Sequence, residues 1–196
     1  MTVIHITQKL QKELGLKQAD LSTIAEHPGP FLEWYSHLFF MDGKKHIIFV
    51  EVETLFSFSL ENVFRKDIQE RLLEFFEKGL GQALHIEGVN REGINKVMNV
   101  CRGGIVFAKA ENHRTIGAMN EFIKQHKHGF FYQSRQIDAR DRFNRFMPMR
   151  GFPGGSKKYE FPIDVFANTL KNLWGIEFSP QKESFFRNMT GSNLEK

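Results

Sequence analysis

Cysteine is almost missing from this sequence, and so are long hydrophobic runs. Cys101 is the only cysteine among 196 residues, which excludes an intramolecular disulfide and a cysteine-based zinc cage. No apolar run approaches the roughly 18 residues that a transmembrane helix needs. The beginning of the chain also lacks the basic-then-apolar pattern of a signal peptide. We therefore expect a cytoplasmic protein without a membrane segment.

Catalytic motifs are absent as well. His126 and His128 stand two residues apart, which places them on different faces of a helix, and no carboxylate lies at a ligand spacing from them. The glycine-rich stretch 151–156 lacks the lysine and the helix start of a phosphate-binding loop. No activated nucleophile or pair of carboxylates can be assembled. We accordingly predict no catalytic residue, no metal ligand and no cofactor, and a non-catalytic role is favoured over an enzyme.

Apolar residues are plentiful enough for a core. They make up 41% of the chain, and Phe alone contributes 21 residues against 3 Tyr and 2 Trp. This length and composition suit a single domain, which we place at residues 1–176. Residues 128–160 form a basic appendage of that domain, and residues 177–196 form a flexible polar tail.

The hydrophobic periodicity predicts an α+β fold: an antiparallel β-meander with helices packed mainly on one face. The meander consists of strands 34–41, 46–50 and 54–60, with a hairpin turn at Asp42-Gly43. The spacing of apolar residues and the capping signals predict the helices and two further strands. In chain order these elements are strand 3–6, helix 8–14, helix 63–80, a helix from Asn90 to Cys101, strand 105–107, a helix from Thr115, helix 134–146 and a helix from Pro162 to before Gly175.

The stretch from Gly104 to Phe122 reads as a strand that leads directly into a helix. Backbone N–H groups at such a junction can face a ligand, so we look for a polar site there. Gly117 and Asn120 lie one turn apart on the helix. Either they admit and bind a ligand, or Gly117 permits tight packing and Asn120 holds a neighbouring loop. The candidate polar site consists of Asn112, Gly117, Asn120 and His37, which can approach His46 across the hairpin.

Basic residues concentrate in one part of the chain. Residues 124–158 contain nine Lys or Arg and two Asp, a net charge of +7, whereas the whole chain carries +4. Phe and Tyr residues are interleaved with them, a mixture typical of single-stranded nucleic-acid binding. The candidate contacts are Arg135, Arg142, Arg145, Arg150, Lys157 and Lys158.

Two other interpretations of the chain remain open. Asp138–Arg142 and Asp141–Arg145 are i, i+4 pairs, so the basic stretch is also consistent with an ordinary solvated helix. Apolar patches at 130–132 and 185–186 are consistent with a protein-interaction module instead. An enzyme of unknown class is the third alternative. The sequence gives no oligomeric state.

Several stretches, in order along the chain, resemble a family of small uncharacterised bacterial proteins that are often encoded with plasmid or prophage genes. The most specific is Ile116 to Glu121, which is similar to the family's Leu-Gly-Ser-Met-Asn-Asp. The other matching stretches are Thr7 to Leu10, Trp34 to Leu38, Thr54 to Ser57, Asn112 to Asn120, Asn144 to Met149 and Pro162 to Asp164. The resemblance implies a shared architecture but no established activity. It also suggests that the interaction module would belong to a mobile-element or host-defence system.

Overall fold

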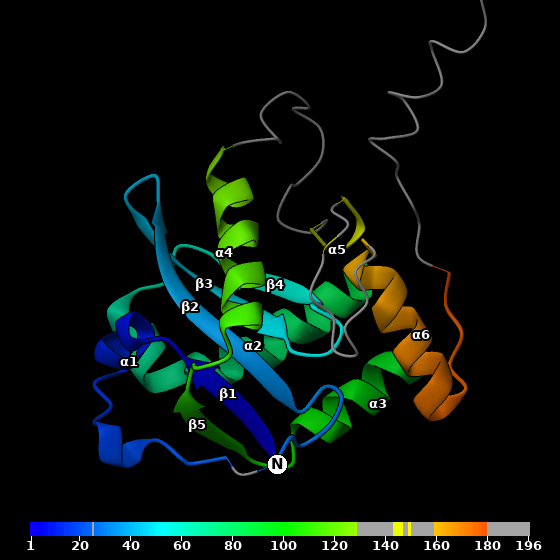
Figure 1. Cartoon of the computed structure of the whole chain (residues 1–196), viewed down its shortest axis with the longest axis horizontal. Helices are drawn as coiled ribbons and strands as arrows, with labels where there is room; N and C mark the ends of the chain where they lie inside the picture. Colours follow the sequence, from blue (N-terminus) through cyan, green and yellow to red (C-terminus); the bar gives the residue numbers. More distant parts are fainter. Residues whose placement is uncertain (25, 129–142, 147–148, 150–158, 180–196) are drawn as a thin grey trace, which may run out of the picture.

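The computed structural model describes residues 1–24, 26–128, 143–146, 149 and 159–179. A five-stranded sheet forms its centre, with the strand order β4-β3-β2-β1-β5 (Figure 1). The elements in chain order are β1 (Thr2–Ile6), α1 (Gln8–Leu14), the 3₁₀ turn η1 (Gln18–Asp20), β2 (Glu33–Met41), β3 (Lys44–Glu51), β4 (Ser57–Leu60), α2 (Arg65–Ile86), α3 (Arg91–Cys101), β5 (Ile105–Lys109), α4 (His113–His128), α5 (Phe143–Phe146) and α6 (Pro162–Trp174). The α+β class predicted from the sequence is confirmed.

The sheet is mixed, so the prediction of a purely antiparallel meander is wrong. Strands β2, β3 and β4 do pair antiparallel, as predicted. Strand β1, however, lies parallel to both β2 and β5, with Ile4 opposite Trp34 on one side and Phe107 on the other. The reason is topological: the chain passes through α1 between β1 and β2, and such a crossover returns it in the same direction.

One face of the sheet packs against α1, α2, α3 and α6. Trp34 and Phe49 from the strands and Phe76 from α2 meet there, all fully buried, with ring centroids 5.3 Å apart for Trp34–Phe76 and 5.1 Å for Phe49–Phe76. Residues of α3 and α6, including Val97, Cys101 and Phe166, extend the same cluster. This layer is the main hydrophobic core.

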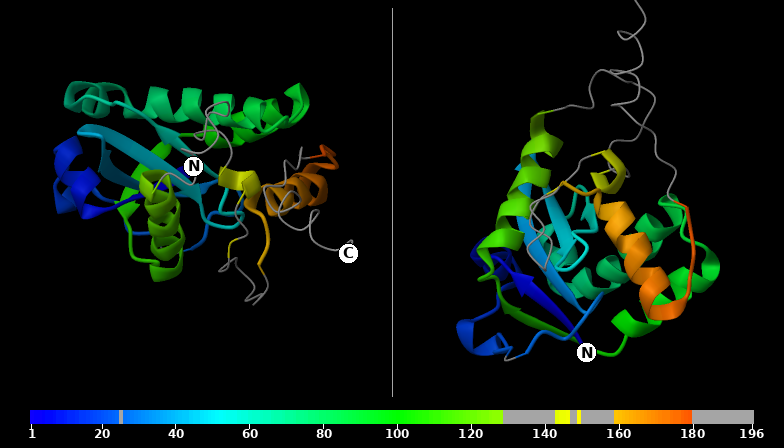
Figure 2. Two further views of the ribbon diagram at one scale, coloured as in Figure 1. Left: turned by 90° about the horizontal axis from the view of Figure 1, so that it is seen from above. Right: turned by 45° about the vertical axis from the view of Figure 1, so that its right-hand side comes forward.

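Helix α4 packs on the opposite face, which corrects the prediction that the helices starting near Val63, Asn90 and Thr115 share one face. Met119 and Phe122 of α4 are fully buried against Phe39 and Ile48 of the sheet. Figure 2 shows the resulting layers, with α2 and α4 on either side of the strands. Thus Met119, Trp34 and Phe49 lie in the core as predicted, whereas Phe107 is only partly buried.

Helix α2 and strand β4 differ in extent from the prediction. Helix α2 continues through Gly79 and Gly81 to Ile86, whereas the sequence predicted an end at residue 80. A Cβ at Gly79 would lie 2.8 Å from Phe58 and 2.9 Å from Leu60, so this glycine allows close packing of α2 on β4. Strand β4 begins only at Ser57, because Leu55 adopts a positive φ of 53° in the turn that follows β3.

Part of the predicted C-terminal organisation falls outside the described residues. Of helix 134–146, only Phe143–Phe146 is described, as α5. The glycine-rich stretch 151–156 and residues 180–196 of the tail lie outside. Helix α6 begins at Pro162 and ends before Gly175, whose φ of 66° gives it the left-handed conformation expected of a helix-terminating glycine.

Candidate functional site

The carboxyl ends of β1 and β5 are the first place to look for a site. The two strands are parallel neighbours, but α1 leaves β1 toward one face of the sheet and α4 leaves β5 toward the other. In open sheets with parallel strands, ligands bind where consecutive helices diverge in this way. Strand β2 extends past the end of β1, because Ser36 pairs with Ile6 and residues 37–41 continue beyond it.

His37 lies just past the end of β1. Its Nδ1 is 2.8 Å from the hydroxyl oxygen of Thr7, the residue before α1, so that hydroxyl does not cap the helix. Burial, together with repulsion from Lys9 and Lys127, lowers the pKa of His37 to about 4. His37 is therefore neutral at pH 7. It does not pair with His46, which stacks on Phe39 with ring centroids 5.3 Å apart.

Two ammonium groups act together on this imidazole. Lys9 is on α1, on the side of the main core, and Lys127 is in the last turn of α4 on the other face. Burial lowers the pKa of Lys9, and Lys127 lowers it further by repulsion. The Nζ of Lys9 lies 4.5 Å from the ring centroid of Phe40, which is 44% exposed. Neither lysine has an ion-pair partner among the residues that the structure describes. We call Lys9, Lys127, His37 and Phe40 the cationic cluster.

Asn112 has a capping role at the start of α4. Its side-chain oxygen accepts hydrogen bonds from the backbone N–H groups of Arg114 and Thr115, at 3.0 and 3.3 Å. Its own backbone N–H donates to the hydroxyl of Tyr35 at 3.1 Å. The N–H groups of Arg114 and Thr115 are thus satisfied within the chain, which weakens the expectation of a ligand there.

Four ionisable side chains form a row that begins at His5, on the face of the sheet covered by α4. His5 Nε2 lies 2.8 Å from one oxygen of Glu33, and the other oxygen of Glu33 contacts His27. His27 also reaches Glu53, at 2.6 Å. Burial alone lowers the pKa of His27, but hydrogen bonds to Glu53 and Glu33 outweigh burial and raise it. We call His5, Glu33, His27 and Glu53 the polar row.

Hydrogen bonds and ion pairs link the four members of the polar row. His5 Nδ1 is 3.0 Å from the carbonyl oxygen of Lys109, so this nitrogen donates and orients the ring, which also stacks on Tyr35 at 4.5 Å. The hydrogen bonds and ion pairs found for the row connect its members to one another and to this carbonyl. Within the described ranges, no group of three or more His, Cys, Asp or Glu side chains is arranged to hold a metal ion.

Gly117 and Asn120 lie on the solvent-exposed face of α4. A Cβ at Gly117 would meet nothing within 4 Å, so tight packing does not explain this glycine. Among the described residues, no hydrogen bond joins Asn112, Gly117, Asn120 and His37 to one another. The candidate polar site of these four residues thus stays a prediction.

Arg145 is buried instead of facing solvent. Its side chain is 7% exposed and forms an ion pair with Glu87, and one of its guanidinium N–H groups donates to the carbonyl of Ile86 at 2.7 Å. This pairing occupies the guanidinium, so we do not carry Arg145 forward as a phosphate contact. The other candidate contacts, Arg135, Arg142, Arg150, Lys157 and Lys158, lie outside the described residues.

Comparison with known proteins gives a family assignment. Residues 3–165 match the family model of a domain of unknown function, DUF6933. The chain belongs to this family. No curated protein and no solved structure matches it. The resemblance to an uncharacterised domain family is thus confirmed, and DUF6933 membership supports neither an activity nor a partner.

Sequence reasoning missed the polar row of this DUF6933 domain, and it did not connect His37 and Lys127 with Lys9 and Phe40 in the cationic cluster. The four members of the polar row come from β1, from the loop before β2, from the start of β2 and from the turn after β3. No periodicity or short motif connects such positions. Lys9 lies within one of the stretches that resemble the family, and this was the single signal that could have drawn attention to it. No helix in the described part of the chain is long and apolar enough to span a bilayer.

Proposed function

We propose that this protein binds single-stranded nucleic acid without catalysing a reaction. The observation that carries the proposal is the cationic cluster, in which Lys9 lies over the exposed ring of Phe40 and is repelled by Lys127. Keeping two like charges together costs stability, and an anionic ligand removes that cost. A polyanion that also presents flat rings fits the cluster, because the lysines bind phosphates and the phenylalanine stacks on a base.

The cluster is continuous with the basic segment 124–158. That segment begins within α4, where Lys124 and Lys127 are both exposed in the last turns of the helix. Lys127 thus belongs both to the cationic cluster and to the segment with the largest excess of positive charge in the sequence. Charge supplies most of the affinity in the binding of nucleic acid, and it acts on every sequence alike. Unpaired bases are favoured, since an exposed ring rewards bases that are free to stack.

The two alternatives from the sequence gain no observation at the residues that suggested them. The aromatic patches at 130–132 and 185–186, which suggested a protein-interaction module, lie outside the described residues. The polar row contains acid and base groups, but an enzyme would also need a group that attacks or polarises a substrate. No hydroxyl, thiol or metal site is joined to the row in the described ranges. Nucleic-acid binding therefore stands first.

Fluorescence anisotropy with a labelled oligo(dT) tests the proposal. The double variant Lys9→Gln, Lys127→Gln should bind more weakly and flatten the salt dependence by up to about 1.4, or about 0.7 for each lost phosphate contact. The control is Arg91→Gln, Lys96→Gln, which removes the same charge from exposed positions of α3, a helix that carries no residue of the cationic cluster. Equal binding by the first variant and the parent would contradict the proposal. So would an equal loss in the control, which would reflect net charge alone.

A further inference from the structure

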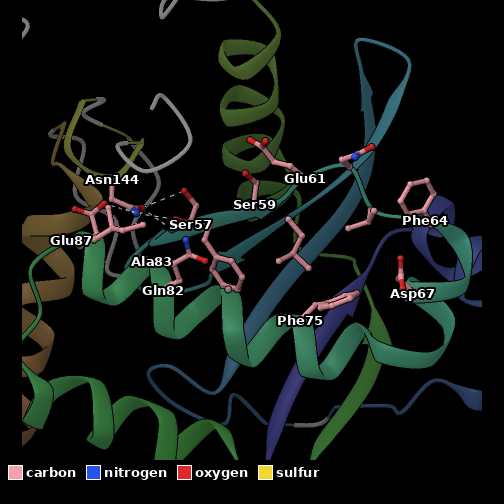
Figure 3. Close-up of a pocket in the computed structure, with 16 residues that line it drawn as sticks. Ser57, Ser59, Glu61, Phe64, Asp67, Phe75, Gln82, Ala83, Glu87 and Asn144 are labelled. Carbon is pink, nitrogen blue, oxygen red and sulfur yellow. Dashed lines mark hydrogen bonds between the residues drawn. The ribbon is translucent and has the colours of Figure 1, made fainter. Parts of the chain in front are cut away.

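A groove runs along the free edge of the sheet, between β4 and α2 (Figure 3). It encloses about 390 Å³. Figure 3 shows Glu87 and Asn144 at one end and Phe64 and Asp67 at the other, with Ser57, Ser59 and Glu61 following one another on the β4 side. The groove is distinct from the cationic cluster, because no residue of that cluster lines it.

The β4 side of the groove is a strand edge, and the side chain of Asn144 on α5 already forms hydrogen bonds with its backbone at Ser57. The side-chain amide of Asn144 accepts from the backbone N–H of Ser57 at 2.7 Å and donates to the Ser57 carbonyl at 2.9 Å. These are the two bonds that a residue of a neighbouring strand would make. Asn144 is buried and bonded to Glu87 at 3.1 Å, so its amide is held in place.

Ser59 is the next residue whose backbone groups point away from the sheet. Alternate residues of a strand direct their N–H and C=O to opposite sides, so Phe58 faces β3 while Ser57 and Ser59 face outward. In the described part of the chain, no backbone group bonds the outward groups of Ser59. Its buried hydroxyl oxygen also lacks a hydrogen-bond partner there. At the other edge of the sheet, by contrast, Ser22 donates to the carbonyl of Phe107 on β5 at 2.7 Å.

The charge of the groove is acidic. Glu61, Asp67 and Glu87 line it, and no Lys or Arg is among the lining residues that the structure describes. Arg145 pairs with Glu87, and His126 Nε2 lies 3.8 Å from a carboxylate oxygen of Glu61, so the preference for a basic ligand rests on Asp67 at the other end. The ring of Phe64, 65% exposed, forms part of that same end. A guanidinium or ammonium group suits this combination, because it pairs with carboxylates and stacks on an aromatic face.

We propose that this groove binds an extended peptide segment of a partner protein that carries a basic side chain. The peptide adds to the sheet as a strand, pairing with the backbone of Ser59, and Asn144 marks the end of the available edge. Its Lys or Arg lies at the end lined by Asp67 and Phe64. Backbone pairing supplies affinity, and the acidic end supplies the preference for a basic residue.

The test compares two short capped peptides of alternating Thr and Val, one carrying a single Arg and the other Glu in its place. Titrated into the ¹⁵N-labelled full chain, the Arg peptide should shift the amide signals of Ser59 and Asp67. It should also bind at least about tenfold more tightly than the Glu peptide, because like charges across an interface are unfavourable. Equal affinity of the two peptides, or shifts that leave Ser59 and Asp67 unaffected, would overturn the proposal.

Variants of the groove separate the two contributions. Ser59→Pro removes the outward N–H at an edge position, where proline is tolerated, and should abolish binding of the Arg peptide. Asp67→Asn should reduce the preference for Arg over Glu, whereas Glu70→Gln, an exposed neighbour on α2 outside the groove, should not. If Ser59→Pro does not fold, the affinities of the Arg and Glu peptides for the parent and for Asp67→Asn still test the proposal. Concentration-dependent dimers that show the same shifts without peptide would identify a second copy as the occupant and overturn the choice of partner.

Discussion

The buried carboxylate of Glu51 accepts hydrogen bonds from both the backbone N–H and the hydroxyl of Thr54, at 2.7 and 2.6 Å. Its other oxygen accepts the backbone N–H of Phe31 at 3.1 Å. Glu51 is fully buried, and burial raises its pKa. A single side chain therefore holds the turn after β3 against the loop before β2. Both Phe31 and Leu55, which flank these contacts, adopt positive φ angles, of 65° and 53°.

Replacing Glu51 should be among the most destabilising substitutions in the protein. Glu51→Ala leaves two buried N–H groups and a hydroxyl without acceptors, and each costs about 1–3 kcal/mol. We expect a loss of at least about 3 kcal/mol in the free energy of unfolding, measured by urea denaturation. Glu51→Gln should lose less, since one oxygen remains to accept from Thr54. A loss below about 1 kcal/mol in Glu51→Ala would show that these bonds contribute little.

Local signals in the sequence predicted the elements well. The side chain of Asn90 accepts from the backbone N–H of Gly93 at 2.8 Å, which is the helix cap that its position before α3 indicated. The positions of β1 and β5 in the sheet, parallel to each other, were not predicted from local signals. Thr2 pairs with Ile105 across about a hundred positions of sequence, and nothing in the hydrophobic pattern of either strand specifies that neighbour. The missed parallel pairing follows from this non-local contact.

The candidate sites also differ in whether local sequence or non-local strand pairing determines them. A cluster of basic residues within one segment is visible in a sequence, but its geometry is not: Arg145 carries the right charge and is buried against Glu87. The cationic cluster and the polar row depend on which strands are neighbours. His5 and Glu33 meet because β1 and β2 are parallel, with Val3 in register with Glu33. An error in strand pairing therefore hides such a site completely.

Two glycines in helices should respond to alanine in opposite directions. At Gly117 the space is open, so Gly117→Ala should stabilise the protein by about 0.5–1 kcal/mol through helix propensity alone. At Gly79 the added Cβ would lie 2.8 Å from the ring of Phe58, and overpacking of this kind costs about 1–3 kcal/mol. Urea denaturation of both variants checks the order. A destabilised Gly117→Ala would mean that its backbone conformation or surroundings differ from those described.

The polar row should make stability depend on pH in a defined window. The pKa of His27 is raised above 6.5 in the folded state, so its contribution is present below pH 6.5 and is lost as the pH rises through the raised value. The pKa of Glu33 is lowered below 4.5, despite burial, by His5 and His27. Its contribution is present above pH 4.5 and is lost as the pH falls through the lowered value.

The stability advantage of the parent over His27→Gln should therefore be largest between pH 4.5 and 6.5. It should remain below about 1 kcal/mol, because His27 is partly exposed to solvent. Thermal unfolding of both proteins across this range provides the measurement. An advantage that grows above pH 8 would have the wrong sign for a protonated His27.

Cys101 should resist thiol reagents while the protein is folded. It is fully buried, and its Sγ lies 3.2 Å from the carbonyl oxygen of Phe31, to which the thiol donates. Burial, assisted by Glu51, raises its pKa to about 12, so almost no thiolate is present at neutral pH. Labelling with a chromogenic disulfide reagent should occur only at the rate of unfolding. Rapid stoichiometric labelling in native buffer would contradict the burial of α3 against the main core.

The salt dependence of nucleic-acid binding tests the central claim most directly. Anisotropy of labelled oligo(dT) and of a matched duplex, measured with the parent protein over a series of KCl concentrations, gives affinity against ionic strength. We expect the single strand to bind more tightly than the duplex. The logarithm of its affinity should fall linearly with that of the salt concentration, with a slope steeper than about −2, as for three or more phosphate contacts. A slope near zero, a preference for duplex, or no binding at low salt would contradict the account.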